Sequence, residues 1–455
     1  MSTPAPSRMA RGGGAGPAFD ALSQSWAALA PGGERWQALR SAGWAVFERE
    51  GFPTTRDEAW KYTSLRRLAR RAFRLDLPVE APASADLAEL LAGELDGPRL
   101  VFLNGRFVPA LSAPSTNGDG LEIDALTKVF DDPQRTGRIG ELADPEAHRF
   151  AALNQAFAGE GARIRTAPDS KIEQPVYVVY LSAAAAEPVA CHPRLVIEAG
   201  PRSSLTVVEH FVGLNDARRP KDENLTNAVT EAFLAPGAQL EHYRVQAESP
   251  TAHHIGGLFA ELTRDARLQS HCVHTGGALA RQDIVVNLVE PGAHVDLHGL
   301  YFVDGKRHTD VHTRVDHRAP HTTSDEEYRG IVTGRGRAVF NGKAVIHPDA
   351  QKTDVKQANA NLLLSPQAEV DTKPELEIYA DDVKASHGAT VGQLDENAMF
   401  YLLSRGIDKD SAKAMLTFAF AEAVIARMTL MPVRRLLEKA IADNLTVGDL
   451  VEDQV

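Results

Sequence analysis

Histidine is unevenly distributed along this 455-residue chain, and all but one of its 16 histidines lie between residues 192 and 387. The densest group contains His308, Asp310 and His312, which would share one face of a β-strand because side chains alternate with a period of two. Imidazole and carboxylate groups suit a zinc or transition-metal site, as in a metal-dependent β-helix or cupin-like enzyme that also uses His317. We favour the simpler interpretation, a polar outer face of a β-helix, because nothing in the sequence fixes the rest of a coordination shell.

Two further groups of histidines allow the same two interpretations. His294, Asp296 and His298 repeat the alternation of the densest group, and for them too we favour a polar strand face. The segment 271–274, His-Cys-Val-His, also resembles a ligand cluster, but its adjacent histidine and cysteine would point to opposite faces of a strand. It is therefore a weak candidate.

Thiol and nucleotide chemistry have little support in the sequence. Cys191 and Cys272 are the only cysteines, so the chain alone can build neither a disulfide framework nor a four-cysteine metal site, and a reducing cytoplasm fits best. The nearest approach to a P-loop, residues 336–344, has one residue too many and ends in Ala344, where Ser or Thr is needed. GxSxG and HExxH motifs are absent, which argues against serine hydrolases and zincins.

The segment 375–392 places acids, a lysine, a serine and His387 between the last expected strands and the C-terminal helices. Gly388 and Gly392 indicate tight turns or a close backbone approach. On residue types alone, His387 would be interpreted as a structural histidine.

The N-terminal part of the chain is expected to be mainly helical. We expect residues 1–18 to be a disordered leader, since they are rich in glycine and lack the apolar region of a secretion signal. A transit peptide is the alternative, because the segment has two arginines and no acidic residue. Residues 19–170 are expected to form a helical and mixed domain, with near-helical spacing of apolar residues and a stop signal at 51–53. A short strand pair is expected at 99–108, around an Asn-Gly turn.

Residues 171–393 are expected to form a β-helix core, because short alternating apolar runs replace the helical period there. A turn of Gly, Pro or Asp followed by the start of a strand recurs at offsets of 35, 28, 27, 44 and 31, at Leu205, Leu240, Leu268, Val295, Val339 and Val370. Such a repeat favours stacked strands. A two-sheet jelly roll stays the alternative, because the repeat is not strict.

Residues 394–455 are expected to form a C-terminal helical domain. Asp395 can cap a first helix that ends at Gly406, and Asp408 or Asp410 can cap a longer second helix. A last amphipathic helix has on one face Val433, Leu436, Leu437 and Ile441.

The charge and apolar pattern exclude two classes of partner. The chain has 49 basic and 61 acidic residues, a net charge of −12, so nucleic acid is not expected as a partner. No run of about 18 apolar residues predicts a membrane span.

Four stretches of the sequence closely resemble the SufB/SufD family of iron–sulfur cluster assembly proteins. They are residues 53–68, 308–346, 351–372 and 373–407, the last of which contains YADDVKASHGATVGQLDEN. The resemblance implies a right-handed parallel β-helix between helical N- and C-terminal domains. It also implies a non-catalytic scaffold subunit of a SufBCD complex, which pairs with a SufB paralogue, docks the ATPase SufC and is supplied with sulfur by a cysteine desulfurase.

Within the family, the SufD branch fits better than SufB. A SufB chain would be expected to carry a sulfur-accepting cysteine near 359–364, and this chain has none after Cys272. His387 matches a family histidine at the SufB–SufD interface that is implied to help hold the nascent cluster. Enterobacterial-type members have a cysteine two residues earlier, where this chain has Ala385, which leaves imidazole as the nearby soft donor.

The resemblance also sets expectations for cofactors and partners. No cofactor is expected on the chain alone, and a transient iron–sulfur cluster is expected in the complex, with His387 as the metal ligand from this side. The segment 395–428 resembles the part that docks SufC. Flavin binding by the complex and a homodimer of the isolated chain are left open.

Overall fold

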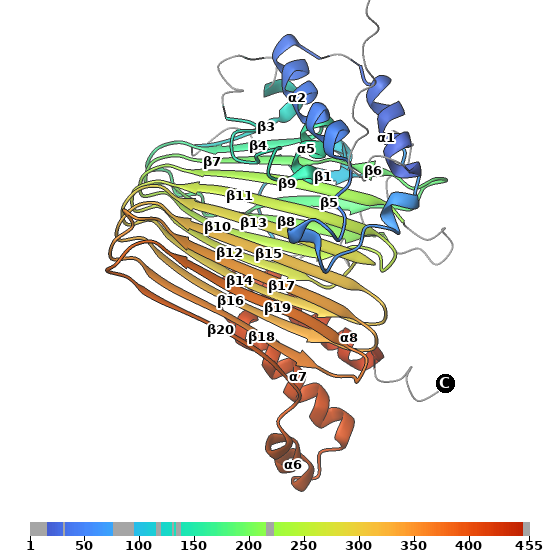
Figure 1. The fold of residues 1–455 in the computed structure, drawn as a ribbon, viewed down its shortest axis with the longest axis vertical. Coiled ribbons are helices and arrows are strands. Elements are labelled where there is room, and N and C mark those ends of the chain that lie inside the picture. The colour runs from blue at the N-terminus through green and yellow to red at the C-terminus, as the bar shows by residue number, and fades with distance from the viewer. Residues whose placement is uncertain are drawn as a thin grey trace, which may run out of the picture.

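The computed structural model describes residues 16–30, 32–75, 95–114, 120–129, 132, 138–214 and 223–448. Nearly all of the expected leader therefore lies outside the described residues. The described chain is a parallel β-solenoid with helices at both ends (Figure 1). This confirms the predicted β-helix core between helical N- and C-terminal segments.

Two sheets face each other across the solenoid, and most successive strands of the core alternate between them. Across the first sheet the order is β2 (Arg106–Phe107), β1 (Arg99–Leu103), β5 (Val176–Ser182), β8 (Ser204–Gly213), β10 (Gln239–Ala247), β12 (Arg267–His274), β14 (His294–Val303), β16 (Thr323–Val332), β18 (Asp354–Leu363) and β20 (Lys384–Gly392). Across the second it is β19 (Glu369–Ile378), β17 (Arg337–Ile346), β15 (His308–His317), β13 (Leu279–Leu288), β11 (His253–Leu262), β9 (Leu225–Leu234), β7 (Arg194–Ala199), β4 (Gly161–Thr166) and β3 (Leu121–Ala125), with β6 (Ala190–Cys191) on β9.

The pairing decides between the two folds that the sequence allowed. In the described chain the pairs β1–β2 and β3–β4 are antiparallel, and the ladders of the core, such as β10–β12 and β15–β17, are parallel. A jelly roll is built from antiparallel strands, so that alternative is wrong. The expected strand pair around Asn104 is present as β1 and β2.

The sequence repeat mixes positions from the two sheets. Its first four positions stack on one inward-facing ladder of the first sheet, in the order Leu205, Leu240, Leu268 and Val295. Val339 instead lies in β17 of the second sheet, and Val370 pairs with Ala338, one residue away from it. The offset of 44 therefore separates a residue of the first sheet from a residue of the second, because turns of similar composition precede strands in both sheets.

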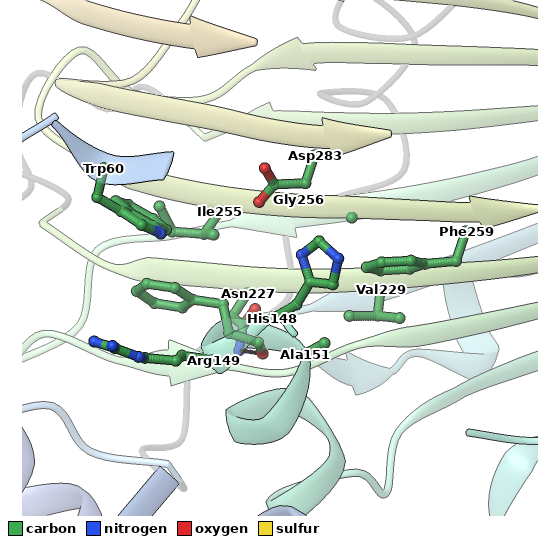
Figure 2. A pocket seen from close by; sticks show the side chains of 12 residues that line it. Trp60, His148, Arg149, Ala151, Asn227, Val229, Ile255, Gly256, Phe259 and Asp283 are labelled. Carbon is green, nitrogen blue, oxygen red and sulfur yellow. Dashed lines mark hydrogen bonds between the residues drawn. The ribbon is translucent and has the colours of Figure 1, made fainter. Parts of the chain in front are cut away.

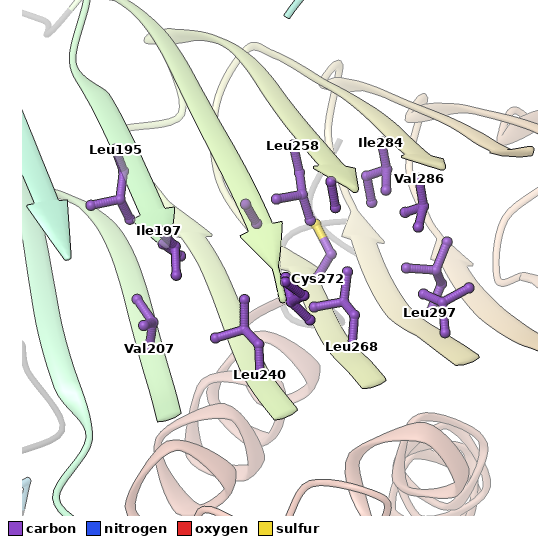
Figure 3. Packing of buried hydrophobic residues seen from close by; sticks show 14 of the residues in the cluster. Leu195, Ile197, Val207, Leu240, Leu258, Leu268, Cys272, Ile284, Val286 and Leu297 are labelled. Carbon is purple, nitrogen blue, oxygen red and sulfur yellow. The ribbon is translucent and has the colours of Figure 1, made fainter. Parts of the chain in front are cut away.

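The main core fills the space between the sheets (Figure 3). Aliphatic side chains such as Leu195 and Ile197 from the second sheet meet Val207, Leu240 and Leu268 from the first. All five are at most 2% exposed, and burial of each such side chain stabilises the fold by about 1.5–3 kcal/mol.

Helices of the N-terminal part pack on the outer face of the second sheet. They are α1 (Pro17–Ala27), α2 (Glu34–Glu50), α4 (Leu126–Val129) and α5 (Arg149–Ala156), with the 3-10 turns η1 (Glu58–Trp60) and η2 (Leu68–Arg70). A third 3-10 turn, η3 (Pro109–Leu111), instead packs on β1 of the first sheet. Gly43 allows α2 to approach α5, because a Cβ there would lie 2.7 Å from the Ala152 carbonyl oxygen. Phe47 and Phe150 then join one apolar cluster with Ile255 of β11.

The C-terminal helices are α6 (Glu396–Ser404), α7 (Lys409–Ile425) and α8 (Met431–Gly448). Asp395 caps α6 through the Ala398 N–H, and Asp408 caps α7 through the Asp410 and Ser411 N–H groups, as predicted. Helices α7 and α8 pack on the outer face of the first sheet, where Ile425 and Leu437 meet Tyr243 and Phe302. Helix α6 projects beyond the last strands (Figure 1) and has no buried residue.

Candidate functional site

His387 lies on the last rung of an inward-facing ladder. In the register of the first sheet, Glu326 of β16 pairs with Gln357 of β18, which pairs with His387 of β20. Glu326 and Gln357 are each 4% exposed, whereas His387 is exposed. The contact of Ala385 with the cluster containing Val355 confirms that this face of β20 continues the interior. His387 is thus an inward-facing residue at the open end of the solenoid, which is formed by the end strands β19 and β20 of the two sheets. We call this end the mouth.

The rungs beneath His387 carry a hydrogen-bonded polar pair. Gln357 Nε2 donates to Glu326 Oε2 at 2.9 Å, and Thr313 Oγ1 donates to Glu326 Oε1 at 2.5 Å. Burial raises the pKa of Glu326 to about 7, although these hydrogen bonds oppose the shift. Gln357 Oε1 is buried and has no hydrogen-bond partner within the described chain, so an unused acceptor lies on the rung next to His387.

The sequence reasoning missed this ladder, although a signal existed. Glu326, Gln357 and His387 follow one another at intervals of 31 and 30 residues, close to the length of one coil of the solenoid. Polar residues one coil apart stack on neighbouring rungs, and a search at that interval would have found them.

The strands at the mouth expose apolar side chains. Ile378 at the end of β19 is 46% exposed, Tyr379 just beyond it 61%, and Val391 of β20 47%. β20 is the last strand of the first sheet, and a Cβ added at Gly388 or Gly392 would meet nothing within 4 Å. The described residues therefore leave the outer face of β20 uncovered at these two positions. Exposed sheet edges of this kind pair readily with other strands.

A second exposed apolar patch, which we call the α6 patch, lies beyond the mouth. It consists of Phe400 (73% exposed), Tyr401 (56%), Leu403 (40%) and Met415 (51%). The first three belong to α6 and the last to α7. Exposed apolar patches often mark protein–protein contacts.

The His308 group shares one strand face, as predicted, but hydrogen bonds and ion pairs within the chain already engage its side chains. Arg281 Nη1 donates to Asp310 Oδ2 at 2.6 Å, and Thr63 Oγ1 donates to the same oxygen at 2.5 Å. His308 Nε2 lies 2.8 Å from Thr63 Oγ1, and His312 Nε2 lies 3.0 Å from Asp310 Oδ1. A guanidinium in the middle of the group disfavours a divalent cation. Nowhere in the described chain are three or more His, Cys, Asp or Glu side chains arranged so that they could hold a metal ion.

Electrostatics support this structural interpretation. Burial alone would raise the pKa of Asp310, but the adjacent Arg281 holds that pKa well below its usual range. Both side chains are 1% exposed, and Arg281 also stacks 4.0 Å from the centre of the Trp60 ring. The pair therefore fastens the N-terminal segment to β13 and β15.

Asp310→Ala is expected to lower the free energy of unfolding by about 1.5–3 kcal/mol, because it removes one of the two carboxylates that bind the buried Arg281 and takes the acceptor from Thr63 Oγ1. Asp283 still binds Arg281 at 2.7 Å in the variant. Asp296→Ala, at a half-buried pair with His294, should cost at most about 1 kcal/mol. Chemical denaturation measures both. If the purified chain instead held stoichiometric zinc, iron or manganese that His308→Ala and His312→Ala released, the metal-dependent enzyme would be the better interpretation.

His317 does not belong with the other three, because an odd separation places it on the opposite strand face. Its Nδ1 and Nε2 atoms lie 2.9 Å from Thr322 Oγ1 and 2.9 Å from Ser324 Oγ, inside the solenoid. The ligand set of the metal-dependent alternative therefore does not include His317.

The remaining histidine groups serve packing and docking. Arg427 Nη1 donates to His298 Nε2 at 3.1 Å, which ties the end of α7 to the first sheet. The His271 ring stacks between Tyr243 and His298, and neither of its nitrogens has a hydrogen-bond partner in the described part of the chain. Cys272 faces the opposite way, as predicted, and burial raises the pKa of its thiol to about 12. It is therefore a poor metal ligand or nucleophile.

A small cavity under α5 is too small for a ligand. It lies between His148, Phe259 and Asp283 (Figure 2), and its volume is about 20 Å³. That volume suits about one water molecule.

By its fold, the chain belongs to the class of parallel β-solenoids whose stack of strands ends in an open edge. Two family models match the chain, the SufBD protein N-terminal region over residues 32–178 and the SUF system FeS cluster assembly, SufBD core domain over residues 180–420. The chain belongs to this SufBD family of iron–sulfur cluster assembly proteins.

Known relatives agree with the family models. Iron-sulfur cluster assembly protein SufD of Escherichia coli (strain K12) is 36% identical over 376 residues, 82% of this chain and 84% of that protein. An iron-sulfur cluster assembly SufBD family protein of Synechocystis is 29% identical over 86% of this chain and 87% of its own length. Protein ABCI7, chloroplastic, of Arabidopsis thaliana is 28% identical over 91% and 86%. No helix in the described residues is long and apolar enough to cross a membrane.

Proposed function

We propose that this chain is a non-catalytic scaffold subunit of a SufBCD-type complex, in which it pairs with a SufB paralogue and docks the ATPase SufC. The observation that carries the proposal is the open mouth, where β19 and β20 expose Ile378, Tyr379 and Val391. A paralogous solenoid would continue the stack of rungs and cover these side chains. In isolation, the same edge could pair with a second copy of this chain.

His387 is the residue through which the mouth would hold a nascent cluster. Its imidazole is exposed at the mouth, and imidazole nitrogen is an accepted ligand for iron. The unpaired Gln357 Oε1 on the neighbouring rung can accept a ring N–H and so fix the orientation of the imidazole, as ligands' hydrogen-bond partners commonly do. Ala385 provides no thiol, so the partner would supply the sulfur ligands.

The α6 patch is the surface that we assign to the ATPase. Helix α6 projects from the solenoid, while α7 and α8 anchor it on the first sheet through Arg427 and Tyr243. Movement of a docked ATPase would reach the mouth through these helices, since α7 contacts β14 and β16. Neither Cys191 nor Cys272 forms a disulfide, which is consistent with a reducing cytoplasm.

His387→Ala is expected to leave folding and complex formation intact and to lower the yield of iron–sulfur cluster on the reconstituted complex by about tenfold, equivalent to about 1.4 kcal/mol. Absorbance and iron content of the anaerobically reconstituted complex measure this yield. Ser386→Ala is the matched control, because it changes the neighbouring position on the other face of β20. An unchanged yield with His387→Ala would remove this residue from the site.

A further inference from the structure

A basic pocket lies on the second sheet, away from the His387 mouth. Its floor is the first residue of four consecutive strands, which form one ladder in the order His253, Leu279, His308 and Arg337. The segment 62–68 crosses these strand ends and forms the opposite wall, held there by the contact between Thr63 and His308. The cavity has a volume of about 320 Å³, within the range of small-molecule sites.

The side chains that line this pocket are strongly one-sided in charge. Arg66, Arg67, Lys306 and Arg337 line it, and no acidic residue does. Arg337 is paired with Asp371 at 2.8 Å and Glu369 at 3.2 Å. The other three cations are exposed and have no carboxylate partner in the part of the chain that the structure describes. Three unpaired cations around one cavity are unusual on a chain with a net charge of −12.

The local field is positive also at the buried end of the pocket. His253 is 5% exposed, and its pKa is lowered to about 4, first by burial and then by the charges of Arg71 and Arg67. Its Nδ1 atom is buried and without a hydrogen-bond partner among the described residues. Apart from the pair of Arg337 with Asp371 and Glu369, no acidic side chain lines the pocket to balance its cations.

We propose that this pocket binds a small organic phosphate. Phosphate oxygens match the guanidinium and ammonium donors, which bind phosphate through strong charge-assisted hydrogen bonds. The pocket is also lined by uncharged side chains, Tyr62, Leu68 and Leu279. Strand spacing of about 4.8 Å places His253 and Arg337 roughly 14 Å apart along the ladder. A molecule with a phosphate group at one end and a ring at the other fits this arrangement, and a nucleoside diphosphate has the required size.

Isothermal titration of the purified full chain with ADP, pyrophosphate and citrate tests the proposal. We expect saturable binding of ADP with a Kd below about 1 mM, weaker binding of pyrophosphate, which lacks the ring, and the weakest binding of citrate, which offers carboxylates. The double variant R67A/K306A should weaken ADP binding at least about tenfold, the loss of about 1.4 kcal/mol. Lys171→Ala, an exposed lysine outside the pocket, is the matched control and should bind as the unchanged chain does.

Three results would overturn the proposal: no saturable binding of either phosphate compound, equal binding of citrate and ADP, or unchanged ADP binding by the double variant. Thermal unfolding of the variants without ligand separates loss of binding from loss of fold. Because Arg67 and Lys306 are exposed, we expect their unfolding temperatures to match that of the unchanged chain. Higher salt should weaken binding further, as for any site dominated by charge.

Discussion

Lowering the pH from 7 to 5 is expected to destabilise the folded chain by on the order of 10 kcal/mol, enough to unfold a typical domain. The cause is a set of buried histidines whose pKa values lie far below the usual 6.5. Burial is the largest cause in each case and lowers the pKa to about 3 or 4 in His192, His210, His253, His271, His274 and His317. Burial removes these imidazoles from water and so disfavours their charged form.

The sign follows from the difference in proton binding. Below pH 6.5 the unfolded chain takes up protons on these histidines while the folded chain does not, so stability falls from pH 6.5 down to the folded pKa values. Each such group contributes about 1.4 kcal/mol per pH unit in this range. Glu326 opposes the trend, because its pKa is raised to about 7 by burial, and its protonation regains about 2 kcal/mol between pH 7 and 5. The histidines outnumber it and decide the direction.

Denaturant unfolding between pH 7.5 and 5 measures this dependence. His271→Phe should lower the number of protons taken up on unfolding by about one and stabilise the chain at pH 5 by about 2 kcal/mol. The reason is that Phe keeps the stacking on Tyr243 without two unpaired ring nitrogens. The matched control is His321→Asn, at an exposed turn with positive φ, which Asn tolerates. A stability that is flat or rises toward pH 5 would contradict the account of the buried histidines.

The double substitution I378D/V391D is expected to weaken binding to a purified SufB paralogue by at least about 100-fold while the chain stays folded. Both side chains are almost half exposed in the isolated chain, so a carboxylate there costs little before pairing. In the paired state it would be buried without a partner, at a cost of several kcal/mol. A loss of about 2.7 kcal/mol in binding free energy is already enough to raise the Kd 100-fold.

Biolayer interferometry with the immobilised partner measures the effect. Met431→Asp is the matched control, because Met431 is 45% exposed at the start of α8 and belongs to neither the mouth nor the α6 patch. Wild-type affinity in the double variant would place the interface elsewhere on the molecule.

Much of the fold was predictable because local patterns and tertiary structure agree. The period-two runs and recurring turns indicated stacked strands, and the caps at Asp395 and Asp408 marked the C-terminal helices correctly. The sequence indicated less clearly which strands pair with one another. Val339 and Leu205 follow similar turns but lie in different sheets, because turn composition does not say which of the two sheets the next strand joins.

For the candidate sites too, the sequence predicted the local arrangement but not the contacts between distant segments. Alternation correctly placed His308, Asp310 and His312 on one face, but it could not show Arg281 on the neighbouring rung or Thr63, 247 residues away from Asp310. Those two residues turn an apparent ligand set into a buried ion pair. His387 is exposed because the described part of the chain adds no rung beyond β20, which only the three-dimensional stack reveals.

The most direct test of the scaffold role is native mass spectrometry of this chain, coexpressed with the SufB and SufC homologues of the same organism and purified through a tag on this chain. The account predicts one complex that contains all three proteins, and the same preparation with I378D/V391D should yield this chain with the ATPase but without the SufB homologue. A wild-type chain that purifies alone, or only with copies of itself, in the presence of both homologues would contradict the account.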